Sequence, residues 1–355
     1  MRIGFHAWTL DYRGSHVAIF DYALQNQVIL GHESVIFYDG LNPGPPEMLK
    51  RFQNHFEMVP YQSFSDMNEL STLRHIDAMY ILKAGHKDHQ FISTTANLIH
   101  AVFPQKISQE HGSVYAYVSR WLSKECSNSR IPYVDHMVSL PKVNDDLRAR
   151  LSIPLDAQVF GYFGGRDSFN LKFVQDVIIN NVEKSKSNYF IFMNVDSFCD
   201  HENVIFLTPN SNLDFKTRFI NTCDAMIHAR GIGESFGLAC AEFSIRNKPI
   251  VTFALSEQKN HIEILKDKAY LYRNSKELDY ILRNFDRKWS RLQSWDCYSQ
   301  QFSPQVIMSK FKEVFLDLSK YTSPSRTTYS LKDRLIIEGK RQIRKLNRSL
   351  LQSKK

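Results

Sequence analysis

The sequence has little or nothing of several features that define particular protein classes. Among its 355 residues there are five cysteines, widely spaced and without a C-x-x-C pair, which argues against a disulfide framework or a zinc site and favours a reducing compartment. No apolar run approaches the roughly 18 residues of a membrane span. The chain opens on a strand-like run at Ile3–Ala7 and shows no secretory signal, so we expect a cytoplasmic protein.

Most of the chain also lacks an excess of charge of either sign. The formal net charge is +8, but residues 330–355 hold nine lysines and arginines against Asp333 and Glu338, which leaves residues 1–329 close to neutral. A nearly neutral body gives no reason to expect a nucleic-acid-binding core. Apolar residues make up 43% and charged residues 23%, an ordinary globular balance over a length that suggests two domains.

Short apolar runs alternate with helical patterns through the first part of the chain. The helix predicted at Val17–Leu30 is followed by Gly31, as many helices are. Predicted strands lie at Ile3–Ala7, Ser34–Tyr38, Ala78–Leu82, Asn97–Phe103 and Val114–Val118. Repeated strand–helix–strand units predict a parallel sheet, and we assign residues 1–141 to a first Rossmann-like domain.

A second alternation of the same kind follows a polar, proline-bounded stretch. Residues 141–154 are predicted to hold the linker and a short helix at 144–150. The strands that follow are predicted at Val159–Phe163, Tyr189–Asn194, Val204–Phe206, Ala225–His228, Ile250–Ala254 and Ala269–Tyr272. Residues 142–301 would form a second Rossmann-like domain. The expected fold is therefore α/β, with two parallel-sheet domains facing each other across a cleft and ligands beyond the carboxyl ends of the strands.

Two further segments complete the chain. The run Phe302–Lys320 is strongly amphipathic and begins with Ser303-Pro304, so we predict a C-terminal crossover helix over 302–320. Residues 321–355 are predicted to be a linker and a basic tail. In the tail, apolar residues recur at helical spacing, namely Leu331, Leu335, Ile343, Leu346 and Leu350. Such a helix is suited to peripheral contact with an anionic membrane, but a solvated tail or a helix packed on the body fits the same pattern.

The most informative stretch is 225–254, AMIHARGIGESFGLACAEFSIRNKPIVTFA. A predicted strand ends in a glycine-rich loop, and the loop opens a predicted helix at Leu238–Arg246, which Ser235 is expected to cap. Free backbone N–H groups and the positive end of the helix dipole make such a turn an anion site, suited to a phosphate.

Two glutamates in this stretch, Glu234 and Glu242, are separated by seven residues. Eight helical steps would place them about 12 Å apart, whereas the paired carboxylates of glycosidases lie about 5–5.5 Å or about 6.5–9.5 Å apart. The two acids are therefore poor partners across one bond. They are suited to opposite ends of a long ligand, because carboxylates accept strong hydrogen bonds from sugar and ribose hydroxyls.

The same segment resembles the E-x7-E region of retaining GT-B glycosyltransferases, glycosyltransferase family 4 in particular. The matching residues are Gly233-Glu234-Ser235-Phe236-Gly237-Leu238, then Glu242, then Lys248-Pro249-Ile250-Val251. The resemblance implies that Glu234 meets the hydroxyls of the donor sugar and that Glu242 holds the nucleotide ribose. It also implies that the backbone of Phe236, Gly237 and Leu238 meets the sugar and diphosphate. The alternative is an α/β protein whose two glutamates are merely solvated.

Two further matches to that family lie outside this segment. The run Phe160–Arg166 resembles the family's G..GR strand end, which implies that Arg166 and Lys172 bind the donor diphosphate and neutralise its developing charge. Phe173 stands where the family commonly has a glycine. The loop before the first long helix resembles a ligand loop of the family, which makes Gly14 a candidate for contact with the donor phosphates and the acceptor.

The family's helper histidine has no matching position in this sequence. His100 lies inside a predicted strand and His111 lies beyond it, and His6 and His16 are equally unassigned. A histidine within a strand is more often a core residue than a functional one. The sequence also has no suitably placed Asp-x-Asp motif, since Asp145-Asp146 fall in the linker, so we expect no metal cofactor.

The resemblance thus implies a retaining glycosyltransferase of the hexosyltransferase type. It would transfer a sugar from a nucleotide-diphosphate sugar, bound mainly by the second domain, to a glycan or lipid-linked acceptor, bound mainly by the first. A nucleotide-sugar epimerase is one alternative, since it would act on the donor alone. Another is a degenerate member of the fold that binds a nucleotide or glycan without turnover.

Overall fold

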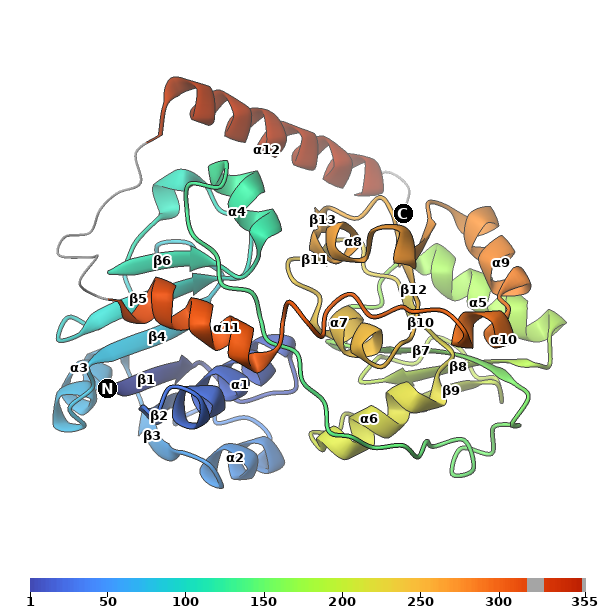
Figure 1. Ribbon diagram of the computed structural model, residues 1–355, viewed down its shortest axis with the longest axis horizontal. Coiled ribbons are helices and arrows are strands. Elements are labelled where there is room, and N and C mark those ends of the chain that lie inside the picture. The colour runs from blue at the N-terminus through green and yellow to red at the C-terminus, as the bar shows by residue number, and fades with distance from the viewer. Residues whose placement is uncertain (318–328, 353–355) are drawn as a thin grey trace. The chain divides into compact units, whose positions relative to one another are not determined.

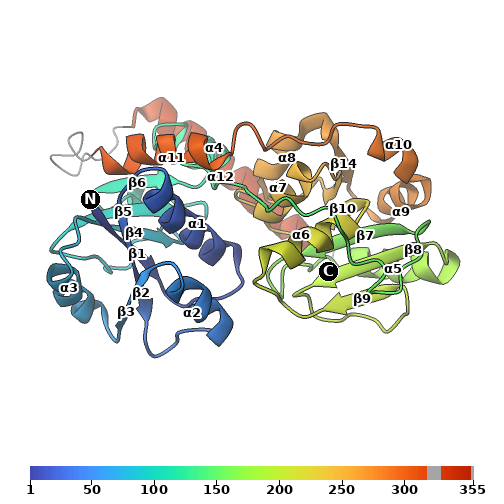
Figure 2. The same cartoon turned by 60° about the horizontal axis from the view of Figure 1, so that its bottom comes forward.

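The computed structural model describes residues 1–317 and 329–352, and the chain folds into two compact units (Figure 1, Figure 2). Unit 1 comprises Met1–Met137 and Phe302–Ile343, and unit 2 comprises Val138–Gln301 and Arg344–Lys355. Most of the predicted linker before the basic tail lies outside the described residues. Within the described part, no helix is both long and apolar enough to cross a membrane.

Unit 1 is built on a six-stranded parallel sheet in the order β3-β2-β1-β4-β5-β6. Its strands are β1 (Arg2–Ala7), β2 (Glu33–Asp39), β3 (Glu57–Tyr61), β4 (Ala78–Lys83), β5 (Ala96–Ala101) and β6 (Val114–Tyr117). The five predicted strands are confirmed, and their apolar runs are buried, as in sheets covered on both faces. The prediction missed β3 because Pro60 interrupts its pattern; proline is tolerated there because β3 is an edge strand.

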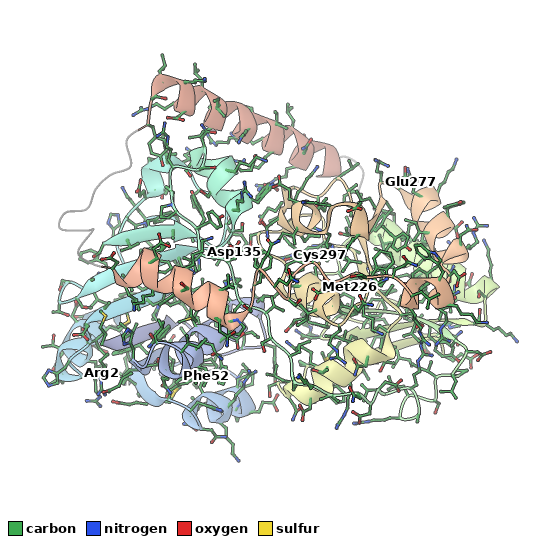
Figure 3. The ribbon with its side chains drawn as sticks, in the orientation of Figure 1. Arg2, Phe52, Asp135, Met226, Glu277 and Cys297 are labelled. Carbon is green, nitrogen blue, oxygen red and sulfur yellow. The ribbon has the colours of Figure 1, made fainter. Side chains whose placement is uncertain are left out.

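Helices and aromatic side chains pack around this sheet. The helices are α1 (Gly14–Val28), α2 (Pro46–Gln53), α3 (Phe64–Leu73), α4 (Arg120–Ser127) and α11 (Pro304–Phe311), with a 3-10 turn at Ile107–Gln109. Helix α12 (Leu331–Gln352) belongs to unit 1 as far as Ile343 and to unit 2 from Arg344 onward. Phe52 on α2, labelled in Figure 3, packs against Phe20 with ring centroids 5.1 Å apart. Tyr22 on α1 stacks on Phe311 at 5.2 Å. The helix predicted over 302–320 is thus α11, followed by a π-helical turn at Lys312–Leu316; residues 318–320 are not described.

Unit 2 repeats the architecture with a six-stranded parallel sheet in the order β14-β12-β10-β7-β8-β9. Its strands are β7 (Gln158–Phe163), β8 (Asn188–Met193), β9 (Val204–Leu207), β10 (Ala225–His228), β12 (Ile250–Phe253) and β14 (Ala269–Tyr272), and β11 (Gly233–Glu234) pairs with β13 (Gln258–Lys259). The order reverses between β7 and β10. Such a switch point is where ligands bind in doubly wound sheets.

The helices of unit 2 follow the strands in alternation. They are α5 (Lys172–Lys184), α6 (Leu213–Thr222), α7 (Leu238–Ile245), α8 (Asn260–Leu265), α9 (Ser275–Asn284) and α10 (Arg287–Arg291), with a 3-10 turn at Lys266–Lys268. Helices α5 and α9 lie side by side, whereas α6 contacts β7 and α7 contacts β10 and β12 (Figure 1). The chain runs from β7 through α5 to β8 in one direction, and from β10 through α7 to β12 in the other. Because both crossovers are expected to be right-handed, α5 and α7 lie on opposite faces of the sheet.

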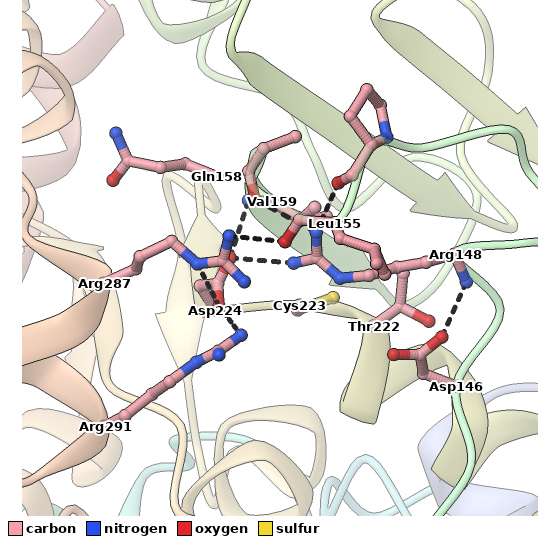
Figure 4. A network of polar contacts seen from close by, with 12 residues as sticks. Asp146, Arg148, Leu155, Gln158, Val159, Thr222, Cys223, Asp224, Arg287 and Arg291 are labelled. Atoms are coloured by element: carbon pink, nitrogen blue, oxygen red, sulfur yellow. Dashed lines mark hydrogen bonds and ion pairs between the residues drawn. The ribbon is translucent and has the colours of Figure 1, made fainter.

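An ionic network around a buried aspartate fixes the first residues of unit 2. Arg148, Arg287 and Arg291 surround Asp224 (Figure 4), and Nη2 of Arg148 donates to Asp224 Oδ2 at 2.9 Å. The side chains of Asp224 and Arg148 are 1% and 5% exposed. Arg148 also donates to two backbone carbonyls of the following turn. The prediction of a helix at 144–150 is therefore wrong: this stretch wraps as a turn around the Arg148 guanidinium.

Candidate functional site

Two loops flank the switch point of unit 2. One follows β7 and carries Gly164-Gly165-Arg166. The other follows β10, the strand that holds Met226, labelled in Figure 3. Asn170 ties them together: its backbone N–H donates to the Ala229 carbonyl at 2.9 Å, and its side-chain oxygen accepts from Gly231 N at 2.9 Å. Both segments predicted to bind a donor thus meet at the carboxyl edge of adjacent strands.

Glu234 lies in the second loop, on the short strand β11, with its side chain 17% exposed. Nη1 of Arg230 donates to both carboxylate oxygens at 3.1 Å, and Nε2 of His228 lies 3.1 Å from Oε1. Burial alone would raise the pKa of this carboxyl, but the Arg230 charge and the His228 hydrogen bond lower it from 4.5 to about 2. Glu234 is therefore a firmly ionised carboxylate at neutral pH.

Behind Glu234 lies a chain of buried polar side chains. Nδ1 of His228 is 2.8 Å from the Thr252 hydroxyl, which is 2.9 Å from Nε2 of His261. All three residues have 0% exposure. Burial lowers the pKa of His261 from 6.5 to about 3, so this imidazole is neutral.

Glu242 lies on α7 and is almost fully buried. Nζ of Lys216, on α6, contacts its Oε1 at 2.8 Å, with side-chain exposures of 12% for the lysine and 7% for the glutamate. Only the steps from Leu238 to Glu242 are helical, because α7 begins at Leu238. The spacing of about 12 Å that eight helical steps would give therefore does not apply to Glu234 and Glu242. Each acid nevertheless has a cationic partner of its own, Arg230 for Glu234 and Lys216 for Glu242.

The turn between the two acids depends on glycine. Gly237 is the N-cap of α7 with φ of +95°, and Gly233 has φ of +73° and a position where a Cβ would lie 2.0 Å from the Gln258 carbonyl oxygen. Both are backbone conformations that side chains disfavour. The prediction that Ser235 caps this helix is wrong, because Gly237 takes the cap position and no described side chain accepts a capping hydrogen bond there. The helix thus begins at Leu238, next to Phe236 and Gly237, as expected.

Arg166 lies on the surface of the first loop, and Lys172 is the exposed first residue of α5, which follows that loop. Arg166, 78% exposed, pairs with Asp196, and Lys172, 69% exposed, donates to Asp176 at 2.6 Å. Asp196 raises the pKa of Arg166 above its ordinary value. Asn194 adopts a left-handed φ of +59°, and its side chain donates to the Gly164 carbonyl at 2.7 Å. The end of β8 is thereby tied to the first loop.

The candidate residues of unit 1 divide into one loop position and a set of core histidines. Gly14 is the first residue of α1 and follows β1, which adjoins β4 where the order of that sheet reverses. His100 is fully buried, bonded to the Tyr80 hydroxyl at 2.6 Å and to the Val134 carbonyl at 2.8 Å. It is therefore a satisfied core residue, as expected for a histidine within a strand. His6 is likewise buried.

The sequence prediction missed five side chains of the unit 2 site: His228, Arg230, Thr252, His261 and Lys216. Three of them, His228, Arg230 and Thr252, stand in the 225–254 segment with Glu234, so the histidine and the arginine at the end of the predicted strand were an available signal. Lys216 and His261 lie outside that segment and have no local signature. Within residues 1–317 and 329–352, no group of His, Cys, Asp and Glu side chains is clustered to hold a metal ion.

Comparison with known proteins gives likeness in structure only. No protein-family model and no curated protein sequence matches the chain. A glycosyltransferase from Rickettsia africae superposes with a TM-score of 0.67 at 11% identity, over 90% of this chain and 99% of that one. HepE of Anabaena, solved with UDP and glucose, gives 0.64 at 14%, over 88% and 98%. A UDP-N-acetylglucosamine 2-epimerase gives 0.56 at 9%, over 88% and 96%. The fold is therefore the α/β GT-B fold of these glycosyltransferases.

Proposed function

We propose that the protein is a retaining glycosyltransferase that moves a hexosyl group from a nucleotide-diphosphate sugar to a glycan or lipid-linked acceptor. One observation carries the proposal: the Glu234 loop and the Arg166 loop flank the switch point of a single parallel sheet, where such sheets bind nucleotides. The resemblance to glycosyltransferase family 4 and the shared fold support it, and the E-x7-E resemblance supports retention.

The ionised state of Glu234 fits a binding role. A carboxyl with a pKa of about 2 is a poor general acid at neutral pH, but its oxygens accept strong hydrogen bonds from sugar hydroxyls. Glu242, held by Lys216 at 2.8 Å, would accept hydrogen bonds from the ribose. The negative charge of each acid is thus balanced before any ligand arrives.

The diphosphate would lie between the two loops. The N–H groups at the start of α7, around Phe236, Gly237 and Leu238, are suited to one phosphate. Arg166 and Lys172 would neutralise the charge that develops as the glycosidic bond breaks. We propose that these cations serve in place of a metal ion. On the acceptor side, Gly14 would let the start of α1 approach the ligand.

Nucleotide-sugar epimerisation is the second candidate, favoured by the likeness to the 2-epimerase fold. The two activities differ in what they require. An epimerase converts the donor in the absence of any acceptor, whereas a transferase needs an acceptor or, at a low rate, water. Incubating nucleotide sugars with the protein alone and analysing the sugar released or converted separates the two.

The first experiment is a thermal-shift screen with UDP, GDP, ADP and their sugars, followed by hydrolysis assays on each ligand that stabilises the protein. Glu242→Ala should then weaken nucleoside diphosphate binding by about 1–3 kcal/mol, because charge-assisted bonds to the ribose are lost. Glu234→Gln should keep that affinity and lose turnover. Equal binding and equal rates in wild type and both variants would contradict the assignment.

The basic tail is proposed to contact an anionic membrane peripherally. On α12, the side chains of Leu331, Leu335, Ile343 and Leu346 are 75%, 67%, 59% and 64% exposed. An amphipathic helix with an exposed apolar side and flanking lysines and arginines is typical of membrane-surface segments. Such contact would place the enzyme near a lipid-linked acceptor.

A further inference from the structure

The polar chain behind Glu234 has a direction. Glu234 is ionised, so its Oε1 can only accept, and Nε2 of His228 at 3.1 Å must therefore be the protonated nitrogen. Nδ1 of a neutral His228 is then an acceptor. The Thr252 hydroxyl, at 2.8 Å, must donate to it. That hydroxyl in turn accepts from Nε2 of His261 at 2.9 Å, and every donor is thereby matched to an acceptor.

Charge balance excludes the competing assignment, in which His228 is an imidazolium. Arg230 already balances the single negative charge of Glu234 through two contacts of 3.1 Å. A second cation at 0% exposure would have to share that one carboxylate with Arg230 and would bear a large cost of desolvation. The remaining nitrogen of the chain, Nδ1 of His261, is buried and has no hydrogen-bond partner among the described residues, as suits an unprotonated nitrogen.

The surroundings hold His228 in place. The Tyr272 hydroxyl donates to the His228 carbonyl at 2.8 Å, and the His261 ring lies 4.9 Å from the His228 ring. A Cβ on Gly237 would lie 3.1 Å from His261 Cβ and 3.3 Å from Glu234 Cβ, so the loop packs closely over the chain. The imidazole thus has one position and one tautomer.

From this geometry we propose that His228 is the positioning residue of Glu234, with Thr252 and His261 fixing its tautomer. Oε1 is the held oxygen, because it accepts the hydrogen bond from Nε2 of His228. Oε2, whose one partner among the described residues is Arg230, is the oxygen that accepts a hydrogen bond from a hydroxyl of the donor sugar. The part concerning the sugar rests on the proposed glycosyltransferase function, whereas the tautomer chain does not.

The tautomers can be measured without any ligand. Two-bond proton–nitrogen correlation spectra of the full-length protein, labelled with 15N-histidine, report which ring nitrogen carries the proton. Spectra of His228→Gln and His261→Gln assign the two signals. Both rings should be neutral and protonated on Nε2 at pH 7.5. A proton on Nδ1 of His228, or an imidazolium at that position, would overturn the proposal.

A matched pair of variants tests the positioning role. Glutamine can place its amide N–H where Nε2 of His228 lies, whereas asparagine reaches only the Nδ1 position beside Thr252. The probes are UDP with UDP-glucose, GDP with GDP-mannose and ADP with ADP-glucose. His228→Asn should lower turnover of the active donor about 10- to 100-fold, as expected for loss of a charge-assisted hydrogen bond, while affinity for the free nucleoside diphosphate stays the same. His228→Gln should recover most of the rate.

A second pair controls for packing. Thr252→Val removes the hydroxyl but keeps the shape, and should mix the His228 tautomers and lower turnover, whereas Thr252→Ser should preserve both. Equal turnover in His228→Asn and His228→Gln, or an unchanged spectrum in Thr252→Val, would refute the positioning role. If none of the nucleotide sugars binds or turns over, the proposed function fails, and the spectra still decide whether the tautomer chain exists.

Discussion

Replacing Lys216 by methionine tests how the buried carboxylate of Glu242 is held. Lys216 contacts Glu242 at 2.8 Å, and its Nζ also lies 5.3 Å from the centre of the Phe163 ring. Methionine keeps most of the apolar stem against that ring and removes only the charge. Any effect of Lys216→Met therefore reports mainly on the Glu242 carboxylate left behind.

The expected effect is large because the pair is buried. With exposures of 12% and 7%, the variant leaves a carboxylate without its counter-ion, which typically costs about 3–5 kcal/mol. Removing both charges in Lys216→Met/Glu242→Gln should restore most of the stability, since the penalty comes from an unpaired charge. The control is Arg273→Met, which breaks the exposed pair with Glu277 (57% and 37% exposed) and should cost no more than about 1 kcal/mol.

Urea titration at pH 7.5, followed by tryptophan fluorescence and circular dichroism, measures the free energies of unfolding of the wild type, Lys216→Met, Glu242→Gln, the double variant and the control Arg273→Met. The first four form a double-mutant cycle that isolates the interaction between Lys216 and Glu242. If Lys216→Met is as stable as Arg273→Met, or if the double variant is as unstable as Lys216→Met, then Glu242 is not held as a buried ion and the preformed ribose site is wrong.

Three further predictions follow from other parts of the chain. Arg166→Ala should lower turnover more than it lowers affinity for the nucleoside diphosphate, because in the proposed mechanism the guanidinium would act on charge that develops in the transition state. Equal losses in kinetics and calorimetry would refute this. Burial lowers the pKa of His6 and of His136 to about 3 and that of His100 well below 6.5. Below about pH 6.5 the unfolded chain therefore binds more protons than the folded protein. The free energy of unfolding should fall by up to about 1.4 kcal/mol per pH unit for each histidine as the solution is acidified. A urea midpoint that is unchanged between pH 7.5 and 5.5 would contradict this prediction. Truncation after residue 329 should abolish co-sedimentation with anionic vesicles, which salt should also weaken; full-length protein that stays in the supernatant at low salt would exclude membrane contact.

The fold could be predicted from the sequence wherever an element is buried in a way that gives a simple pattern of apolar residues. The strands β7, β8, β10 and β12 are covered on both faces, so they read as unbroken apolar runs, and their positions were found within a residue or two. The errors lie where a single residue determines the local backbone conformation. Pro60 interrupts the apolar pattern of an edge strand, which was therefore missed. The Arg148 guanidinium bonds to Asp224, and the segment expected to be a helix forms a turn around it.

The candidate site was predictable from the sequence only for residues that lie within a local motif. Glu234, Glu242 and Gly237 stand in one motif, so one segment was enough to propose them as candidates. Lys216 is 26 residues from its partner Glu242, and Thr252 is 24 residues from His228. Their types are ordinary for a helix and a strand, so only the three-dimensional packing of α6, α7 and β12 reveals what they do.

The two kinds of ion pair at this site imply an order of events on ligand binding. Arg166 and Lys172 are more than two-thirds exposed in their pairs, and exposed pairs are worth at most about 1 kcal/mol, so turning either cation toward a diphosphate costs little. Glu234 and Glu242 are only 17% and 7% exposed and each is paired with a cation, so separating either acid from its partner would leave a charge largely inside the protein. The acids are therefore positioned before the ligand arrives, and the exposed cations are the side chains that should move. A nucleotide-bound structure in which Glu242 had left Lys216 while Arg166 still paired with Asp196 would reverse this order.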